Sequence, residues 1–469
     1  MLEHYQVITA VAVFLVTYAL IVSEKIHRTV AAFTAAAFLV LIGVMNVRNA
    51  VEAIDFNTIG LLVGMMVIVG VTRKTGIFQY TAVKAAKLSR GKPFIIIAAL
   101  ALVTAVLSAF LDNVTTVLLI VPATFSIARR LELNPVPFLI SEIVASNIGG
   151  AATLIGDPPN IMIGGATGLG FMDFLINLTP VLLVTYIITI FIIRLIFRRE
   201  LSTRQELQER IMELDENQEI KDPELLRKCL IVLFLTVLGF FLHQYVHLES
   251  SVIALSGMSL LLLITREDVT DSINAVEWSV IFFFIGLFVT VGALDKVGVI
   301  EAVAGWSLEV THGNMIASGM LTLWISAIAS AFVDNIPFVA TMIPLIQDMG
   351  RLGGIADLNF LWWALSLGAC LGGNGTIIGA SANVIVIAMA EKRGYSISFI
   401  GFMKVAFPLM LMSIVLSTVY LVLWFYFNRT VVLVSTLGLG IVLQIALSVF
   451  SKYRSMPDEN KAASDGAIA

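Results

Sequence analysis

Two Asp-Asn pairs lie within strongly apolar segments of the sequence. Asp112-Asn113 occurs in SAFLDNVTTVLLIVP, and Asp334-Asn335 occurs in SAFVDNIPFVATMIP. A carboxylate near the centre of a bilayer costs roughly 2.5–3.5 kcal/mol, and a serine would cap a helix there more cheaply. Since a carboxylate can hold a proton or pair with a cation, we expect both pairs to bind a coupling ion, Na⁺ or H⁺, with these four residues as Na⁺ candidates. The alternative is that they only cap helices at two hairpin tips.

A second kind of segment holds too many helix-breaking residues to form one continuous helix. The two examples are GGAATLIGDPPN, residues 149–160, and GGNGTIIGASAN, residues 372–383. Unwound carbonyls coordinate Na⁺ and half-helix N-termini attract anionic groups, so we expect a broken helix at each. The candidate ion- and substrate-binding residues are Asp112, Asn113, Thr115, Thr116, Gly149, Gly150, Thr153, Gly156, Asp157, Asn160, Asp334, Asn335, Gly372, Gly373, Asn374, Thr376, Gly379 and Asn383. For the hydroxyl and amide side chains, a hydrogen bond between helices is an equally good explanation.

Other residues limit the chemistry. Glu142 lies in the apolar run before the first break and is a further candidate proton carrier, unless it lies near a membrane interface. Almost every Arg and Lys lies in a loop or at a helix end, so we expect no buried basic residue and a substrate that is neutral, weakly charged or accompanied by cations. No nucleophile, base or cofactor arrangement appears, and GGNGTIIG lacks the lysine of a phosphate-binding loop. We expect no enzyme, no cofactor besides the coupling ion, and no nucleic-acid partner.

The elements that carry these residues occur twice. A shift of 222 residues superposes the two Asp-Asn segments, and it also matches Gly64, Gly70 and Gly76 to Gly286, Gly292 and Gly298. A shift of 223 superposes the two glycine-rich segments. Inverted repeats with paired interrupted helices are typical of secondary transporters, whose sites lie near the membrane midplane.

Composition places these repeats in a bilayer. The chain has 469 residues, 58% hydrophobic and 13% charged, with a mean hydropathy of +0.95. Apolar runs of about 18 residues or more recur along it, each long enough to cross the hydrocarbon as a helix. The expected order is a first repeat at 1–197 with an interrupted segment at 93–128 and a broken helix at 138–168, a charged linker at 198–225, a second repeat at 226–427 with the corresponding parts at 314–349 and 361–391, a final helix at 430–450 and a tail at 451–469.

The basic residues indicate an orientation, because cytoplasmic loops accumulate Lys and Arg. One set of loops, with the linker and the tail, carries 24 Lys and Arg, and the opposite set carries four. We therefore expect the N-terminus outside, and the linker and C-terminus in the cytoplasm of a cell with this protein in its inner (plasma) membrane. Parity alone leaves open whether each interrupted segment is re-entrant or crosses twice.

The segments SAFLDNVTTVLLIVP, SNIGGAATLIGDPPNIMIG and SAFVDNIPFVATMIP resemble the ion transporter superfamily, in particular its branch of arsenite permeases, NhaD-type Na⁺/H⁺ antiporters and the melanosomal P protein. The resemblance covers nearly the whole chain. It implies an all-α polytopic membrane protein of two inverted-topology repeats, each with a re-entrant helical hairpin and a broken transmembrane helix, plus an extra C-terminal helix. It further implies a homodimer and elevator-type movement of a transport domain. The hairpin tips carry Asp-Asn where the divalent-anion symporters have Ser-Asn-Thr, which disfavours dicarboxylate symport.

The expected function is secondary active transport of a small anion or a weak acid such as arsenite or silicic acid, coupled to Na⁺ or H⁺. Asp112 and Asp334 are the expected coupling carboxylates. The alternative keeps the same site and makes the cation the cargo, as in Na⁺/H⁺ antiport. A channel or an inert membrane scaffold is a third reading, which the paired broken helices disfavour.

Overall fold

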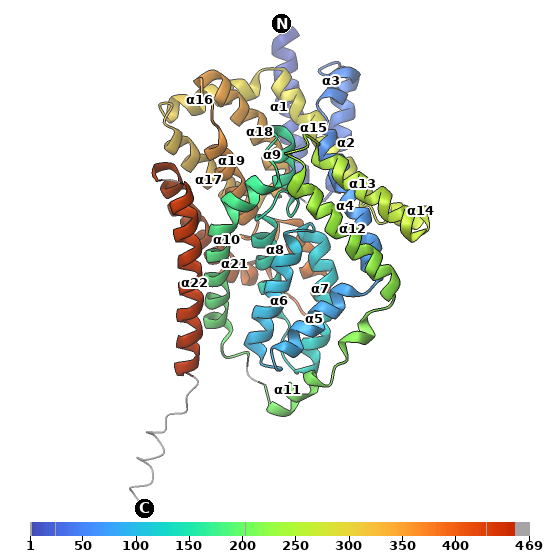
Figure 1. Ribbon diagram of the computed structural model, residues 1–469. Coiled ribbons are helices and arrows are strands. Elements are labelled where there is room, and N and C mark those ends of the chain that lie inside the picture. Colours follow the sequence, from blue (N-terminus) through green and yellow to red (C-terminus); the bar gives the residue numbers. More distant parts are fainter. Residues whose placement is uncertain (1, 24, 202, 428, 455–469) are drawn as a thin grey trace, which may run out of the picture.

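The computed structural model describes residues 2–23, 25–201, 203–427 and 429–454. Every regular element within these residues is a helix (Figure 1). Seven of the described helices are long and apolar enough to cross a membrane, and shorter apolar helices accompany them. The expected all-helical membrane fold is thereby confirmed. The tail expected at 451–469 lies outside the described residues from residue 455 onward.

The first repeat begins with helices that lie apart from its hairpin and its broken helix. It comprises α1 (Leu2–Ser23), α2 (Arg28–Leu41), α3 (Val47–Glu52), α4 (Phe56–Lys74), α5 (Ile77–Leu88), α6 (Pro93–Ser108), α7 (Asn113–Arg130), α8 (Val136–Gly150), α9 (Pro158–Thr167) and α10 (Phe171–Phe197). The second repeat follows the same order. It comprises α12 (Pro223–Leu242), α13 (Ser250–Thr265), α14 (Val269–Ile273), α15 (Trp278–Lys296), α16 (Val299–Val310), α17 (Met315–Phe332), α18 (Asn335–Gly353), α19 (Asn359–Gly372), α20 (Ser381–Glu391) and α21 (Phe399–Tyr426), and α22 (Arg429–Arg454) ends the described chain.

The charged linker between the repeats is docked against the first of them. It contains α11 (Gln205–Met212) and a short 3₁₀ turn at Glu216–Glu219. Lys87 of α5 donates to the Leu214 carbonyl (2.7 Å) and to Glu216 Oε2 (2.5 Å). The hydrogen bond from Lys87 holds the pKa of Glu216 below its ordinary value. The linker is therefore held to α5 by a charged contact.

Each repeat contains a helical hairpin. Helices α6 and α7 are joined through residues 109–112, and α17 and α18 are joined through Val333 and Asp334. Figure 1 shows the first hairpin in the lower half of the molecule and the second in the upper half. Hydrogen bonds from Asn113 and Asn335, at the two tips, converge on one residue, Asp157. Both hairpins thus end at the centre of the molecule, as expected of two re-entrant hairpins.

Each repeat also contains a helix that breaks at the same central level. The first ends as α8 at Gly150 and resumes as α9 at Pro158, and the second ends as α19 at Gly372 and resumes as α20 at Ser381. Proline suits the first position of α9 because its missing N–H is not needed there. The breaks leave backbone groups that require partners in a membrane, and these partners form part of the site described below.

The repeats are related by an approximate two-fold axis. Gly64 of α4 packs against Ala254 of α13, and Gly286 of α15 packs against Ala32 of α2. A Cβ atom on Gly64 would lie 2.8 Å from the Ala254 Cβ, and one on Gly286 would lie 2.6 Å from the Ala32 carbonyl carbon. Exchanging the repeats by 222 residues turns one contact into the other. Such reciprocal contacts are the mark of two-fold symmetry, so each repeat packs its helices against the other.

The close crossing of α17 and α19 gives a testable packing prediction. A Cβ atom on Gly368 would lie 2.5 Å from the Leu323 carbonyl oxygen and 2.8 Å from the Ser326 Cβ. We expect Gly368→Ala to destabilise the protein by about 1–3 kcal/mol, since backbone must move to make room. Gly305, inside α16, has no atom within 4 Å of an added Cβ, and Gly305→Ala should stabilise by about 0.5–1 kcal/mol. Thermal unfolding in detergent should shift in opposite directions, and shifts of the same sign would contradict the packing.

Candidate functional site

Asp157 lies where the two hairpin tips and the first break meet. Its side chain has no exposed surface. Asn113 donates through Nδ2 to Asp157 Oδ1 at 3.4 Å, and Asn335 donates through Nδ2 to both carboxylate oxygens at 3.4 Å. No lysine, arginine or histidine of the described chain forms an ion pair with Asp157. One carboxylate is therefore shared by one amide from each repeat, through long hydrogen bonds.

Asn147 connects this carboxylate to the second break. It accepts a hydrogen bond from Asn113 Nδ2 at 3.0 Å. Its own Nδ2 donates to Asn374 Oδ1 at 2.9 Å and to Asn383 Oδ1 at 3.2 Å. A continuous amide network thus joins the tip of the first hairpin to the second broken helix, across 227 residues of sequence between Asn147 and Asn374.

Two asparagines satisfy the unwound backbone of the breaks. Asn160 donates to the carbonyl oxygens of Ala151 (3.1 Å) and Thr153 (2.9 Å). Asn383 donates in the same way to the carbonyls of Gly373 (2.7 Å) and Thr376 (2.8 Å). The side chains expected as ligands at these two positions therefore hold the shape of the breaks.

Hydroxyl groups fasten each hairpin tip to the break of its own repeat. The Thr153 hydroxyl donates to the Ala109 carbonyl, and the Thr376 hydroxyl donates to the Ala331 carbonyl. Glycines make this approach close, because a Cβ on Gly379 would lie 2.8 Å from the Ser330 carbonyl oxygen. The same close approach of backbone occurs at the other candidate glycines, which are Gly149, Gly150, Gly156, Gly372 and Gly373. These glycines thus act through close packing of backbone.

The two tip aspartates are held differently. Asp112 caps α7 by accepting from the Thr115 N–H (2.9 Å) and the Thr115 hydroxyl (2.5 Å). Asp334 accepts from the Ile336 N–H at 3.1 Å. The second repeat has Pro337 at the position of Thr115. Since proline has neither an N–H nor a hydroxyl, the second oxygen of Asp334 is left for another partner.

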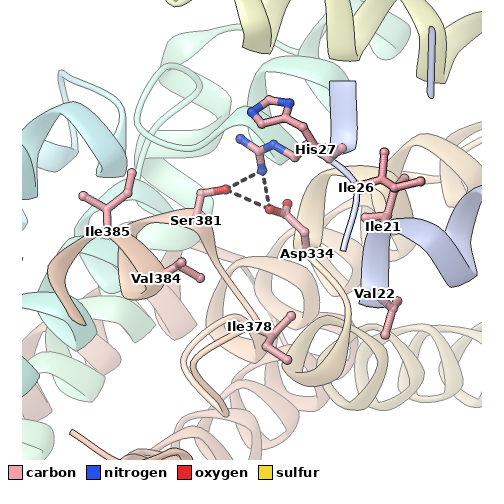
Figure 2. A pocket seen from close by; sticks show the side chains of 10 residues that line it. Ile21, Val22, Ile26, His27, Asp334, Ile378, Ser381, Val384 and Ile385 are labelled. Carbon is pink, nitrogen blue, oxygen red and sulfur yellow. Dashed lines mark hydrogen bonds and ion pairs between the residues drawn. The ribbon is translucent and has the colours of Figure 1, made fainter. Parts of the chain in front are cut away.

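That partner is Arg28, at the start of α2. Arg28 Nη1 lies 2.7 Å from Asp334 Oδ2 and 2.6 Å from Ser381 Oγ, and Ser381 Oγ also donates to Asp334 Oδ2 at 2.8 Å (Figure 2). The guanidinium carbon lies 5.1 Å from the centre of the Phe283 ring. The expectation that no basic residue reaches the site is therefore wrong. It failed because Arg28 was assigned to a solvated loop, whereas α2 begins at the depth of the hairpin tip.

Two cavities adjoin at this arginine. The inner cavity, about 30 Å³, is lined by the polar residues Arg28, Asp112, Asn113, Asp157, Glu277, Asn335 and Ser381. The outer cavity, about 290 Å³, shares Arg28 and Ser381 with the inner one and adds Asp334 with apolar walls that include Ile21, Ile378 and Ile385 (Figure 2). The inner cavity has room for about one water molecule or bare ion. The outer cavity is close to the lower end of the volumes that hold small molecules.

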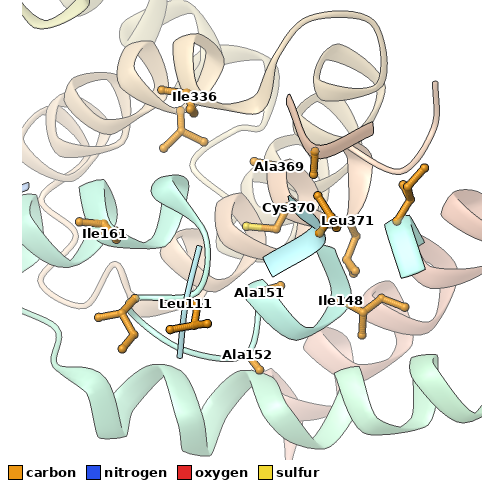
Figure 3. Packing of buried hydrophobic residues seen from close by; sticks show 14 of the residues in the cluster. Leu111, Ile148, Ala151, Ala152, Ile161, Ile336, Ala369, Cys370 and Leu371 are labelled. Carbon is orange, nitrogen blue, oxygen red and sulfur yellow. The ribbon is translucent and has the colours of Figure 1, made fainter. Parts of the chain in front are cut away.

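Apolar packing surrounds the polar centre. Leu111 at the first tip, Ala151 in the first break and Cys370 of α19 belong to one buried hydrophobic cluster, and Figure 3 shows them close to Ile148 and Ile336. Exclusion of water strengthens every electrostatic interaction at the centre. Among the described residues no three His, Cys, Asp or Glu side chains are grouped as a metal centre would require.

The structure brings most of the predicted residues to one centre and adds three. Asn113, Asp157, Asn335, Asn374 and Asn383 belong to the amide network. The Thr116 hydroxyl is buried between helices and forms no hydrogen bond with a described residue. The residues that the sequence prediction missed are Arg28, Asn147 and Glu277. Of these, Asn147 stands directly before the Ile-Gly-Gly of the first break, where the run SNIGG was a usable signal.

Comparison with known proteins is consistent with this architecture. Residues 18–368 match the family model described as citrate transporter, CitMHS. An uncharacterised transporter of Mycobacterium tuberculosis is 42% identical over 424 residues, which are 89% of this chain and 99% of the relative. The P protein of Homo sapiens is 36% identical over 499 residues, which are 89% of this chain and 60% of the P protein.

Solved structures support the fold. The YdaH transporter of Alcanivorax borkumensis superposes with a TM-score of 0.55 at 16% identity, over 90% of this chain and 98% of its own. MtrF of Neisseria gonorrhoeae, described as illuminating a class of antimetabolite efflux pumps, gives 0.56 at 14% identity, over 84% and 85%. The family and its relatives are transporters, so the chain is not an enzyme. The resemblance found in the sequence is confirmed, and the chain belongs to the citrate transporter (CitMHS) family of membrane transporters.

Proposed function

We propose that the protein is a secondary active transporter that moves a small anion or weak acid coupled to a cation, H⁺ or Na⁺. The observation that carries the proposal is the pair of cavities that adjoin at Arg28. The inner cavity suits a bare cation, and the outer cavity suits a small anionic or acidic cargo. Coupling follows because Arg28 and Ser381 line both cavities, so the occupant of one changes the charge felt by the other.

The excess of carboxylates supports a cation in the inner cavity. Asp112, Asp157 and Glu277 line it, and Arg28 is its one basic lining residue among the described residues. Carboxylates buried without matching positive charge are costly, so a proton or a metal ion stabilises them. Of the candidate carboxylates, Asp157 is the best placed, because Asp112 caps α7 and Asp334 pairs with Arg28.

Arg28 supports an anionic cargo in the outer cavity. A guanidinium is a planar donor that binds carboxylates and oxyanions through paired hydrogen bonds. In the structure its Nη1 is paired with Asp334, whose carboxylate occupies the place of a bound anion. An arriving anion would compete with Asp334 for Arg28, and a cation taken up nearby would compensate the displaced carboxylate.

Movement between the two sides is proposed to follow the division of the fold. The crossing helices α2, α4, α13 and α15 pack against one another across the repeats and would form the stationary part. The hairpins and broken helices, fastened together by Thr153 and Thr376, would move as one body. The loop charges support an N-terminus outside the cell and a cytoplasmic C-terminus.

The alternative function is Na⁺/H⁺ antiport, with the cation itself as cargo. It is favoured by one observation, the three carboxylates around a cavity large enough only for an ion or a water molecule. In that case the outer cavity would serve as the access route.

A flux assay with purified protein in liposomes separates the two functions. Internal pH is followed while Na⁺, Li⁺, arsenite, silicic acid or a dicarboxylate is added outside. We expect no proton movement with Na⁺ or Li⁺ alone, and movement of protons or of Na⁺ when one acid or anion is supplied. Proton movement driven by Na⁺ or Li⁺ without any anion would overturn the proposal in favour of cation antiport.

A further inference from the structure

A strip of buried polar side chains runs between α7 and α8 of the first repeat. The strip, called here the α7–α8 strip, consists of Thr116 and Thr124 on α7 and Glu142, Ser146 and Asn147 on α8, and each is at most 1% exposed. Thr116 and Thr124 are eight residues apart, and Glu142 and Ser146 are four apart, so each pair lies on one face of its helix. The five side chains therefore form one line along the contact between the two helices.

Glu142 is the ionisable member of the strip. Its Oε1 accepts from the Thr124 hydroxyl at 2.5 Å, and its Oε2 receives no hydrogen bond from any described residue. No basic residue of the described chain pairs with it. A buried carboxylate without a counter-charge is costly, whereas a carboxyl group that holds a proton carries no charge to compensate.

The second repeat shows that the fold does not need these polar groups. The equivalent positions on α18 and α19 are Phe338, Ile346, Leu365, Ala369 and Cys370. Leu365 and Ile346, which replace Glu142 and Thr124, are fully buried. The same helix contact is thus built from apolar side chains in one repeat and from a polar strip in the other. Packing alone does not explain Glu142.

The strip ends at the site. Asn147 accepts from Asn113, and Asn113 donates to Asp157. Since α7 and α8 run in opposite directions, Thr116 and Ser146 lie between this end of the strip and Glu142. The Thr116 hydroxyl forms no hydrogen bond with a described residue, so it can accept one proton while releasing another.

We propose that Glu142 is a proton-binding residue that exchanges its proton with Asp157 along the α7–α8 strip. One proton leaves a Glu142 carboxyl oxygen and one is gained by an Asp157 carboxyl oxygen, with hydroxyls passing it between them. Resting on the proposed function, this makes the proton the coupling ion and confines its route to the first repeat, because the second repeat has no equivalent strip.

Infrared spectroscopy of the purified protein in lipid tests the proton on Glu142 without any transport. At neutral pH we expect the carbonyl stretching band of a protonated carboxylic acid in the wild type. The difference spectrum against Glu142→Gln should contain that band, because glutamine keeps the size of the side chain and its bond from Thr124 but holds no carboxyl proton. A difference spectrum with the bands of an ionised carboxylate would overturn the proposal.

A flux measurement tests the route. In liposomes, proton flux driven by the gradient that drives the wild type should fall by about 10²-fold in Glu142→Gln. The double variant Glu142→Leu, Thr124→Ile carries the pair found in the second repeat; it should unfold at or above the wild-type temperature and also lose proton flux. Unchanged flux in both variants would overturn the route. Absence of wild-type flux with every anion would instead refute the proposed function, and the infrared result would stand apart from it.

Discussion

Replacement of Asp157 by asparagine is expected to abolish coupled transport in a protein that still folds. Asparagine has the size of aspartate, and its carbonyl oxygen can still accept a hydrogen bond from Asn113 or Asn335, which now both donate to the carboxylate. It cannot take up a proton or balance the charge of a metal ion. Coupled flux into liposomes should fall by about 10²-fold or more, the usual contribution of a positioned proton carrier.

Asp112→Asn is the matched control for this prediction. Asp112 and Asp157 line the same inner cavity, but Asp112 caps α7, and asparagine caps a helix about as well as aspartate. We expect the Asp112 variant to keep most of the wild-type flux. The reverse result, loss of flux in Asp112→Asn with Asp157→Asn active, would return the coupling role to the hairpin tip that the sequence first suggested.

The two-repeat fold was predictable because the chain contains two versions of each element. Gly64 and Gly286 recur 222 residues apart since each makes the same close helix crossing, against Ala254 and Ala32. A crossing this close requires a residue without a side chain, so the constraint is visible in the sequence twice. The positions of the breaks follow for the same reason, because glycine and proline act locally on the backbone.

The site was harder to predict, because recurrence marks what both repeats need in order to fold. Thr153 and Thr376 recur, and both fasten a hairpin tip to a break. Asp157 does not recur, since Ala380 stands at its equivalent position. The chemistry therefore lies where the repeats differ. Arg28 differs too, and its contact spans 306 residues of sequence, a distance over which spacing carries no information.

Replacement of Arg28 by glutamine is expected to weaken anion binding by about 10- to 100-fold. Charge-assisted hydrogen bonds contribute about 1.5–3 kcal/mol each, and every 1.4 kcal/mol is a factor of ten in affinity. Arg28→Lys should recover part of the loss, because lysine keeps the charge but not the planar pair of donors. Equilibrium binding of the anion that drives flux, measured on protein in detergent, gives the three dissociation constants.

Asp334→Asn makes the prediction sharper, because it should act in the opposite direction. If an anion displaces the Asp334 carboxylate from Arg28, removal of that carboxylate leaves the guanidinium free, and the anion should bind more tightly than it does to the wild type. A purely structural ion pair predicts weaker binding in both variants, since either change leaves one half-buried charge without its partner. Opposite signs for Arg28→Gln and Asp334→Asn therefore identify Arg28 as the residue that holds the cargo, and equal signs reduce the pair to a fastening between α2 and the second hairpin.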